Sequence, residues 1–149
     1  MNGRSLIFVF FAFLVIFTLI LFYFQNFAYY ERLDVKNKLL IEKKMVEVTR
    51  YNGIDASSSG LKLRECFTII DESFDSKGLT KYQKPTPLNA PFWFGCFNAG
   101  SITKDLNTNK AVAFLSKKEE FDGIDKVIAL YPDGSVFQWR QLNDKYMDK

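Results

Sequence analysis

The stretch LIFVFFAFLVIFTLILFYF, Leu6–Phe24, decides how the rest of the chain is read. Sixteen of its 19 residues are Leu, Ile, Val or Phe, and none is charged. At about 1.5 Å per residue, such a helix is about 29 Å long, which matches the roughly 30 Å hydrocarbon core of a bilayer. The sequence therefore predicts a transmembrane anchor, which we expect over residues 6–27 after a tail at residues 1–5.

The flanks of this run indicate that it is retained. It is longer than the apolar region of a cleaved signal peptide, about 7 to 15 residues, and no small-x-small cleavage site follows it. Aromatic side chains near its C-terminal end are typical of the belt that holds a helix end at the lipid headgroups. The chain is thus expected to be a single-pass protein of the inner (plasma) membrane, with the lipid bilayer as a partner. The candidate membrane-interface residues are Tyr23, Phe27, Tyr29 and Tyr30.

Two observations disagree about the side of the membrane on which the rest of the chain lies. Only Arg4 precedes the apolar run, whereas five basic residues follow it between Arg32 and Lys44, and this bias favours the cytoplasm. A short basic head before a long apolar run is instead typical of a signal anchor, and two cysteines suit an oxidising compartment. We expect a periplasmic domain, and the cytoplasmic orientation stays open.

The composition excludes several classes of partner, catalytic site and metal site for this domain. Its basic and acidic residues alternate along the chain, so we expect no nucleic-acid partner. The chain has no histidine, which excludes Ser-His-Asp and Cys-His nucleophilic sites and the usual zinc sites. The remaining carboxylate pairs lie beside loops, where solvated acids are ordinary. We therefore expect no catalytic residues, no metal site and no cofactor.

Hydrophobic patterning predicts an α+β domain with a mainly antiparallel sheet of four or five strands and one or two short helices. Residues 31–43 match neither a helical nor a strand period, and we expect a juxtamembrane segment over residues 28–43 that extends the helix or acts as a spacer. The soluble domain is expected over residues 44–149. Predicted strands lie at residues 44–50, 61–70, 111–115, 124–131 and 135–142.

Turn signals connect these strands. Asn52-Gly53 and the serines that follow predict a turn and flexible loop over residues 51–60. The sequence YPDGS, residues 131–135, predicts a β-hairpin, because proline sets the turn and glycine supplies a positive φ between two apolar runs.

The aromatic run FWFGCF, residues 92–97, is the most unusual stretch outside the anchor. Pro91 suits a first helical turn, which predicts a short helix over residues 91–98. One hypothesis is that this helix packs its aromatic face against the sheet. The other is that Phe92 and Phe94 stay partly exposed and contact a partner protein or the membrane surface. The candidate interaction residues are Phe92, Trp93, Phe94 and Phe97.

The only two cysteines, Cys66 and Cys96, are 30 positions apart. A structural disulfide between them is our first hypothesis, and it would stabilise the domain by about 3 to 4 kcal/mol in the chain-entropy model. Strict strand alternation places Cys66 on the opposite face from Phe67, unless a bulge near Glu65 changes the phase. Two buried free thiols and a redox-active pair are the alternatives, although no C-x-x-C motif is present.

Short motifs along nearly the whole chain carry a family resemblance. They are Met1-Asn2-Gly3, Tyr29-Tyr30, Arg64-Glu65-Cys66-Phe67, Pro87-Leu88-Asn89-Ala90-Pro91, Trp93-Phe94-Gly95-Cys96-Phe97, Gly123-Ile124-Asp125 and Pro132-Asp133-Gly134 with Trp139. On these motifs the chain resembles a domain-of-unknown-function family of small single-span membrane proteins of alphaproteobacteria, some of which have been called histidine kinases. The resemblance implies the anchor and the cysteine pair as family features, and it implies no activity. The kinase label conflicts with the lack of histidine and with the small domain.

These observations predict a membrane-anchored, non-catalytic envelope domain. We expect it to bind or scaffold another membrane or envelope protein, or to be an accessory subunit of a membrane complex. The alternative is a thiol-based redox protein that uses Cys66 and Cys96.

Overall fold

The structure is a computed structural model that describes residues 2–146. Its first element is the helix α1 (Gly3–Asn26), which is long and apolar enough to cross a membrane. The helix includes the whole apolar run and begins within the predicted N-terminal tail. Met1 and residues 147–149, at the outer ends of the predicted tail and of the predicted domain, lie outside the described residues.

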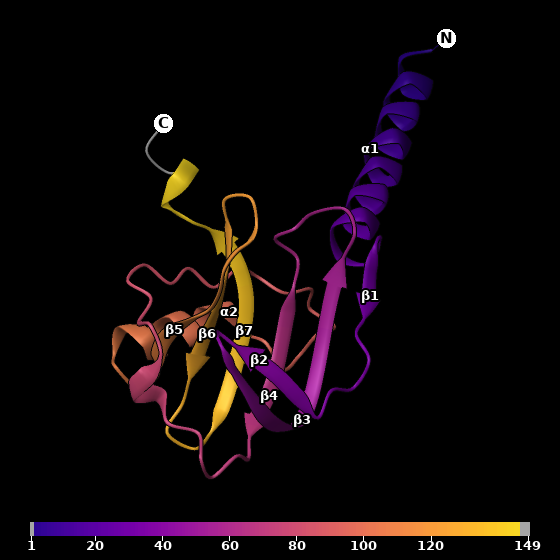
Figure 1. The fold of residues 1–149 in the computed structure, drawn as a ribbon. Coiled ribbons are helices and arrows are strands. Elements are labelled where there is room, and N and C mark those ends of the chain that lie inside the picture. The colour runs from indigo at the N-terminus through magenta and orange to yellow at the C-terminus, as the bar shows by residue number, and fades with distance from the viewer. Residues whose placement is uncertain (1, 147–149) are drawn as a thin grey trace.

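The rest of the described chain is built on an antiparallel sheet (Figure 1). The sheet has seven strands in the order β1-β3-β4-β7-β6-β5, and β2 also pairs with β3. The α+β class with a mainly antiparallel sheet is confirmed, and the sheet is larger than the four or five strands expected. The strands are β1 (Tyr30–Arg32), β2 (Lys38–Ile41), β3 (Lys44–Ala56), β4 (Arg64–Ile69), β5 (Val112–Phe121), β6 (Ile124–Leu130) and β7 (Ser135–Leu142).

The two additional strands, β1 and β2, lie in the segment that we expected to be a spacer or a helix extension. β1 pairs with the end of β3, and β2 forms a hairpin with its beginning. These strands have only three and four residues, too few to display a period in the sequence. Only residues 27–29 separate α1 from β1, and Ala28 among them is buried. The helix is therefore joined to the sheet without a flexible linker.

β3 is longer than predicted, because it continues through Asn52-Gly53, where the sequence predicts a turn. A register shift between Thr49 and Asn52, with Arg50 at a φ of 53°, bends the strand instead. A Cβ atom on Gly53 would lie 2.6 Å from the hydroxyl oxygen of Tyr51. This glycine is needed for a close approach inside the sheet and not for a turn.

The sheet curls on itself, so that β2 approaches β5. The backbone N–H of Glu42, directly after β2, donates to the carbonyl oxygen of Ser116 in β5 at 2.6 Å. The curled sheet encloses a hydrophobic cluster that we call the inner core. It consists of Ile41, Val46, Val48, Tyr51, Phe67, Leu79, Phe114, Ile128 and Val136.

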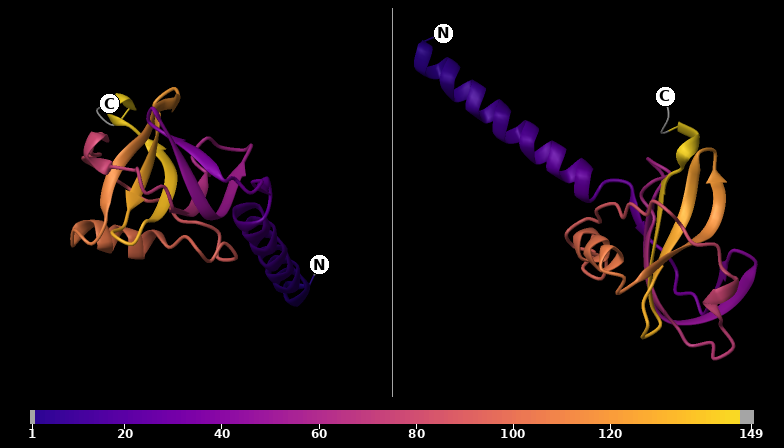
Figure 2. Two further views of the ribbon diagram at one scale, coloured as in Figure 1. Left: turned by 60° about the horizontal axis from the view of Figure 1, so that its bottom comes forward. Right: turned by 90° about the vertical axis from the view of Figure 1, so that its left-hand side faces the viewer.

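The opposite face of the sheet is covered by the helix α2 (Ala99–Asn107) and by the segment that precedes it (Figure 2). Two 3-10 turns, η1 (Ser76–Gly78) and η2 (Asp144–Tyr146), complete the described elements. The cluster under α2 is called the outer core. It consists of Ile54, Cys66, Phe94, Phe97, Ala99, Ile102, Ala113, Val127, Ala129 and Trp139.

The helix predicted over residues 91–98 is absent, and turns occupy this segment. α2 begins only at Ala99, because the side chain of Asn98 accepts a hydrogen bond from the backbone N–H of Ser101 at 2.9 Å and caps the helix there. The aromatic run therefore lies before the helix and is free to direct its rings to different sides.

Candidate functional site

Alternate residues of β4 enter different cores. Cys66 lies in the outer core and Phe67 in the inner core, and both are buried. The pairing of β4 with β7 runs without interruption from Arg64↔Trp139 to Thr68↔Ser135. Strict alternation therefore holds, and no bulge is needed near Glu65, because both faces of the strand are covered.

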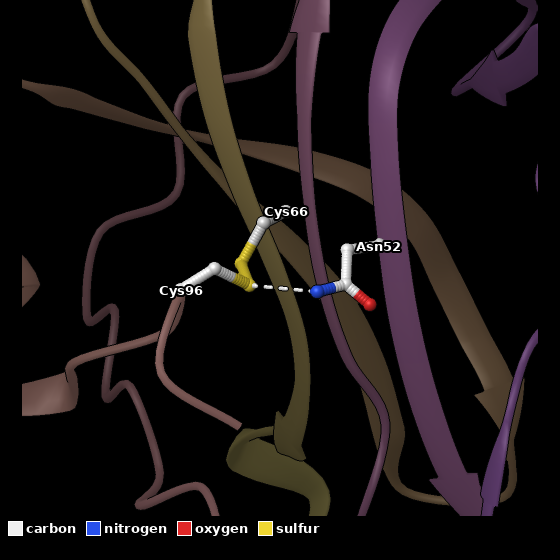
Figure 3. Close-up of a disulfide and its surroundings, with 3 residues drawn as sticks. All are labelled: Asn52, Cys66 and Cys96. Atoms are coloured by element: carbon white, nitrogen blue, oxygen red, sulfur yellow. Dashed lines mark hydrogen bonds between the residues drawn. A yellow bond between two sulfur atoms is a disulfide. The ribbon is translucent and has the colours of Figure 1, made fainter. Parts of the chain in front are cut away.

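Cys66 and Cys96 form a disulfide, with their Cα atoms 6.4 Å apart (Figure 3). The pairing that we expected is thus present, and neither cysteine is free. Cys66 is buried, whereas Cys96 is exposed. The side-chain amide of Asn52 in β3 donates to Sγ of Cys96 at 3.9 Å. The bond attaches the end of the aromatic run to the centre of the sheet.

Arg64, two residues before Cys66 on the same face of β4, holds the beginning of the segment. Its guanidinium donates to the carbonyl oxygens of Leu88 at 2.9 Å and Asn89 at 3.1 Å, and also to those of Leu61 and Leu63. The side chain is 4% exposed and forms no ion pair within residues 2–146. Burial lowers the pKa of Arg64 to about 10, so the group stays charged near neutral pH.

Between these two attachments, Trp93 contacts the end of α1. Its indole N–H donates to the carbonyl oxygen of Asn26 at 2.5 Å, which satisfies one of the carbonyls left free at a helix C-terminus. Its ring stacks on Phe27, with 6.4 Å between centroids, and meets Tyr30 edge-on at 5.9 Å. The guanidinium of Arg32 lies over the same ring.

Phe92 extends this contact along the helix. Its ring stacks on Phe22 at 5.9 Å and meets Phe27 edge-on at 5.8 Å, yet 67% of the residue is exposed. We call the group Phe22, Phe27, Tyr30, Phe92 and Trp93 the aromatic junction.

The remaining candidate residues have different positions. Phe94 and Phe97 are buried in the outer core, so the alternative hypothesis that Phe94 stays partly exposed is wrong. The turn closed by the N–H of Phe94 and the carbonyl of Pro91 directs the ring inward, as a helix at this place would not. Tyr23 and Tyr29 are exposed beside the junction, and Tyr23 stacks on Phe27.

The inner core contains a buried carboxylate that the sequence pattern did not single out. Glu65 is 2% exposed and accepts hydrogen bonds from the hydroxyl of Tyr51, at 2.5 Å, and from the amide of Gln138. Lys36 lies 3.6 Å from the same carboxylate. Burial and the charge of Glu65 raise the pKa of Tyr51 far above its usual value. Satisfied groups of this kind indicate a structural role.

A groove lined mainly by polar and charged residues lies beside β5, β6 and β7. Its buried carboxylate, Asp125, accepts hydrogen bonds from the hydroxyl of Tyr82, the backbone N–H of Glu119 and the amide of Asn143. Burial, together with the hydrogen bond to Asp125, raises the pKa of Tyr82 above its usual range. Residues 2–146 contain no group of His, Cys, Asp or Glu side chains arranged to hold a metal ion. The aromatic junction is the candidate site, because its large apolar residues Phe27 and Phe92 are 43% and 67% exposed.

Comparison with known proteins gives a family and no activity. No curated protein and no solved structure matches the chain. A family model matches residues 35–148, which include β2 to β7 and both cysteines and leave out α1 and β1. The chain belongs to the family of unknown function DUF6446.

Proposed function

We propose that this protein is a single-pass membrane protein whose folded domain acts in the periplasm as a non-catalytic binding or accessory subunit of a membrane complex. The observation that carries the proposal is the aromatic junction, which joins α1 to the domain through the bond between Trp93 and Asn26. A domain attached in this way stays at the membrane surface, where a neighbouring membrane protein can contact it.

Exposed rings around the end of α1 support a binding role. Phe27 and Tyr29 are 43% and 58% exposed. Clustered apolar surface of this kind marks contacts with a partner protein or with a membrane. The disulfide supports the periplasmic side, because such bonds persist in oxidising compartments and are rare in the cytosol.

A photo-crosslinking amino acid at position 29 tests the partner. Introduced in native membranes, it is expected to give a discrete product with one membrane or envelope protein, because Tyr29 is exposed beside α1. The matched control is position 45, since Met45 is equally exposed but lies on the β2–β3 hairpin, on the opposite side of the domain from α1 (Figure 2). Identical patterns at both positions, or no product at position 29, would contradict the binding role.

Alkylation of intact membranes before gel electrophoresis tests the compartment. A periplasmic domain is expected to resist alkylation at Cys66 and Cys96 until a reductant is added. Complete alkylation without reductant would place the domain in the cytoplasm.

One observation favours a second function, thiol-disulfide exchange. Cys96 is an exposed residue and Cys66 is a buried one, which favours attack by an external thiolate on the Cys96 side of the bond. Attack there would form a mixed disulfide at Cys96 and release Cys66 as a thiolate. Rapid reduction of the native protein by a dithiol such as reduced thioredoxin would support this function, and a bond that resists reduction until the domain unfolds would exclude it.

A further inference from the structure

Phe92 places an exposed apolar ring beside the last turns of α1. Its neighbour Phe22 belongs to the apolar run, and the two rings are stacked with their centroids 5.9 Å apart. Most of the surface of Phe92 faces the medium that surrounds the helix. Where α1 spans a membrane, as proposed above, that medium is the boundary between the acyl chains and the headgroups.

The tip of the loop, residues 91–95, has a composition that suits such a boundary. Residues 91–95, PFWFG, contain no charged side chain, and Pro91 has no backbone N–H. The N–H of Phe94 donates to the carbonyl of Pro91 at 2.9 Å, and the indole N–H of Trp93 donates to Asn26. These bonds satisfy two of the donors of the loop, which would otherwise be costly in a medium with little water.

Side chains of β4 also fix the position of residues 91–95. Arg64 binds the carbonyls of Leu88 and Asn89, before the tip, and the disulfide holds Cys96 after it. The tip is therefore attached to β4 at both ends and to α1 in the middle. These attachments keep the ring of Phe92 exposed and prevent it from packing into the core.

We propose that residues 91–95 form a membrane-insertion loop. Phe92 enters the edge of the acyl-chain layer beside Phe22, and Trp93 lies among the headgroups, where indole rings are enriched. The lipid bilayer occupies this surface, because Phe92 continues the lipid-facing surface of α1. The inference rests on the proposed membrane span of α1. With two points of contact, the domain has a fixed orientation on the membrane.

Tryptophan quenching in vesicles tests this loop. The full chain is reconstituted into phosphatidylcholine vesicles that contain phospholipids brominated near the headgroup or near the middle of the acyl chains. Trp139 is fully buried in the outer core, so Trp93→Phe leaves an indole remote from lipid and supplies the baseline. The wild-type protein is expected to lose more emission than this variant.

A swap of the two aromatic residues measures depth without removing a ring. In Phe92→Trp/Trp93→Phe the indole moves to the exposed position, and we expect stronger quenching by bromine near mid-chain than in the wild type. The matched control is Met45→Trp/Trp93→Phe, on the β2–β3 hairpin away from α1, which should not be quenched. Quenching at the Trp93→Phe baseline in both the wild type and the swap would overturn the insertion loop.

Extraction with alkaline carbonate separates this inference from the membrane span itself. Protein that stays in the vesicles but shows only baseline quenching would disprove the loop alone. Protein that is released would disprove both the span of α1 and the loop.

Discussion

The two sides of β4 are closed by different means. On the inner side, strands enclose the core, and Glu65 ties three of them through Tyr51 and Gln138. On the outer side, a short helix and an irregular segment form the cover, and Arg64 and Cys66 hold that segment in place. The difference shows that the irregular cover is held by a disulfide and by side-chain bonds to its backbone carbonyls, whereas paired strands enclose the inner core. The segment held by these attachments is also the one that meets α1.

Removal of the carboxylate from the inner side should have the largest effect. Glu65→Ala leaves the Tyr51 hydroxyl, the Gln138 amide and the Lys36 ammonium without their common partner. We expect a loss of about 3 to 6 kcal/mol in the free energy of unfolding, because each of the two buried hydrogen bonds to the carboxylate contributes about 1.5 to 3 kcal/mol. Urea denaturation of the full chain in detergent micelles measures it. Glu65→Gln is the matched control and should lose less, because its amide oxygen still accepts a hydrogen bond; equal losses would refute the role of the charge.

Loss of the disulfide should be nearly as costly but local to the outer side. For Cys66→Ala/Cys96→Ala the chain-entropy model gives a loss of about 3 to 4 kcal/mol. Hydrogen exchange by mass spectrometry should show faster exchange in residues 88–98 than in the wild type, with little change in β5 and β6. Uniform acceleration across both sides would break the comparison, since it would mean that the two cores open together.

Replacement of Arg64, which holds the segment on the outer side, should have an intermediate effect on the free energy of unfolding. Arg64→Lys keeps the charge but loses donors to the carbonyls of Leu88 and Asn89, and we expect a loss of about 2 kcal/mol. The fluorescence of Trp93 should change as the segment loosens, and Arg50→Lys, at an exposed position, is the control. An unchanged spectrum would show that the disulfide alone positions the tip.

Acid should weaken the polar contacts among β5, β6 and β7 that Glu120 makes with Lys126 and Arg140. The burial of Glu120 raises its pKa, but hydrogen bonds from Lys126 and Arg140 outweigh this and lower the pKa below its ordinary 4.5. Because the folded pKa is depressed, the stabilisation is present above 4.5 and is lost as the pH falls through the lowered value.

Glu120→Gln should therefore be less stable than the wild type by about 1 kcal/mol near neutral pH. The two proteins should converge as the solution is acidified, and denaturation curves at a series of pH values measure the difference. A difference that does not depend on pH would assign the effect to packing and not to charge.

Local sequence signals predicted the elements that local chemistry determines. The YPDGS turn forms as expected, with Gly134 at a φ of 85° and its N–H bonded to the carbonyl of Tyr131. The uncharged run of α1 is likewise a helix. In these places the signal and the structure involve the same few residues.

The features that escaped prediction depend on residues distant in the sequence. β1 and β2 are too short to show a period and exist because β3 offers them an edge. Pro91 favours a first helical turn, but the cap at Asn98 starts the helix later and the disulfide holds Cys96 in the preceding segment. The role of Glu65 cannot be inferred from its own strand, because its partners Tyr51 and Gln138 come from other strands. The aromatic run could be recognised from the sequence, but the sequence did not show which of its rings is exposed.

The alternation of Arg64, Glu65, Cys66 and Phe67 has a consequence for folding. If β4 paired with its neighbours one residue out of register, each of these side chains would exchange sides, and the sulfur of Cys66 would point away from Cys96. The disulfide can then close only on a correctly aligned sheet. Oxidation would then distinguish the two pairings. Chains with slipped strands would keep free thiols and could still rearrange, whereas correctly paired chains would be fixed by the disulfide.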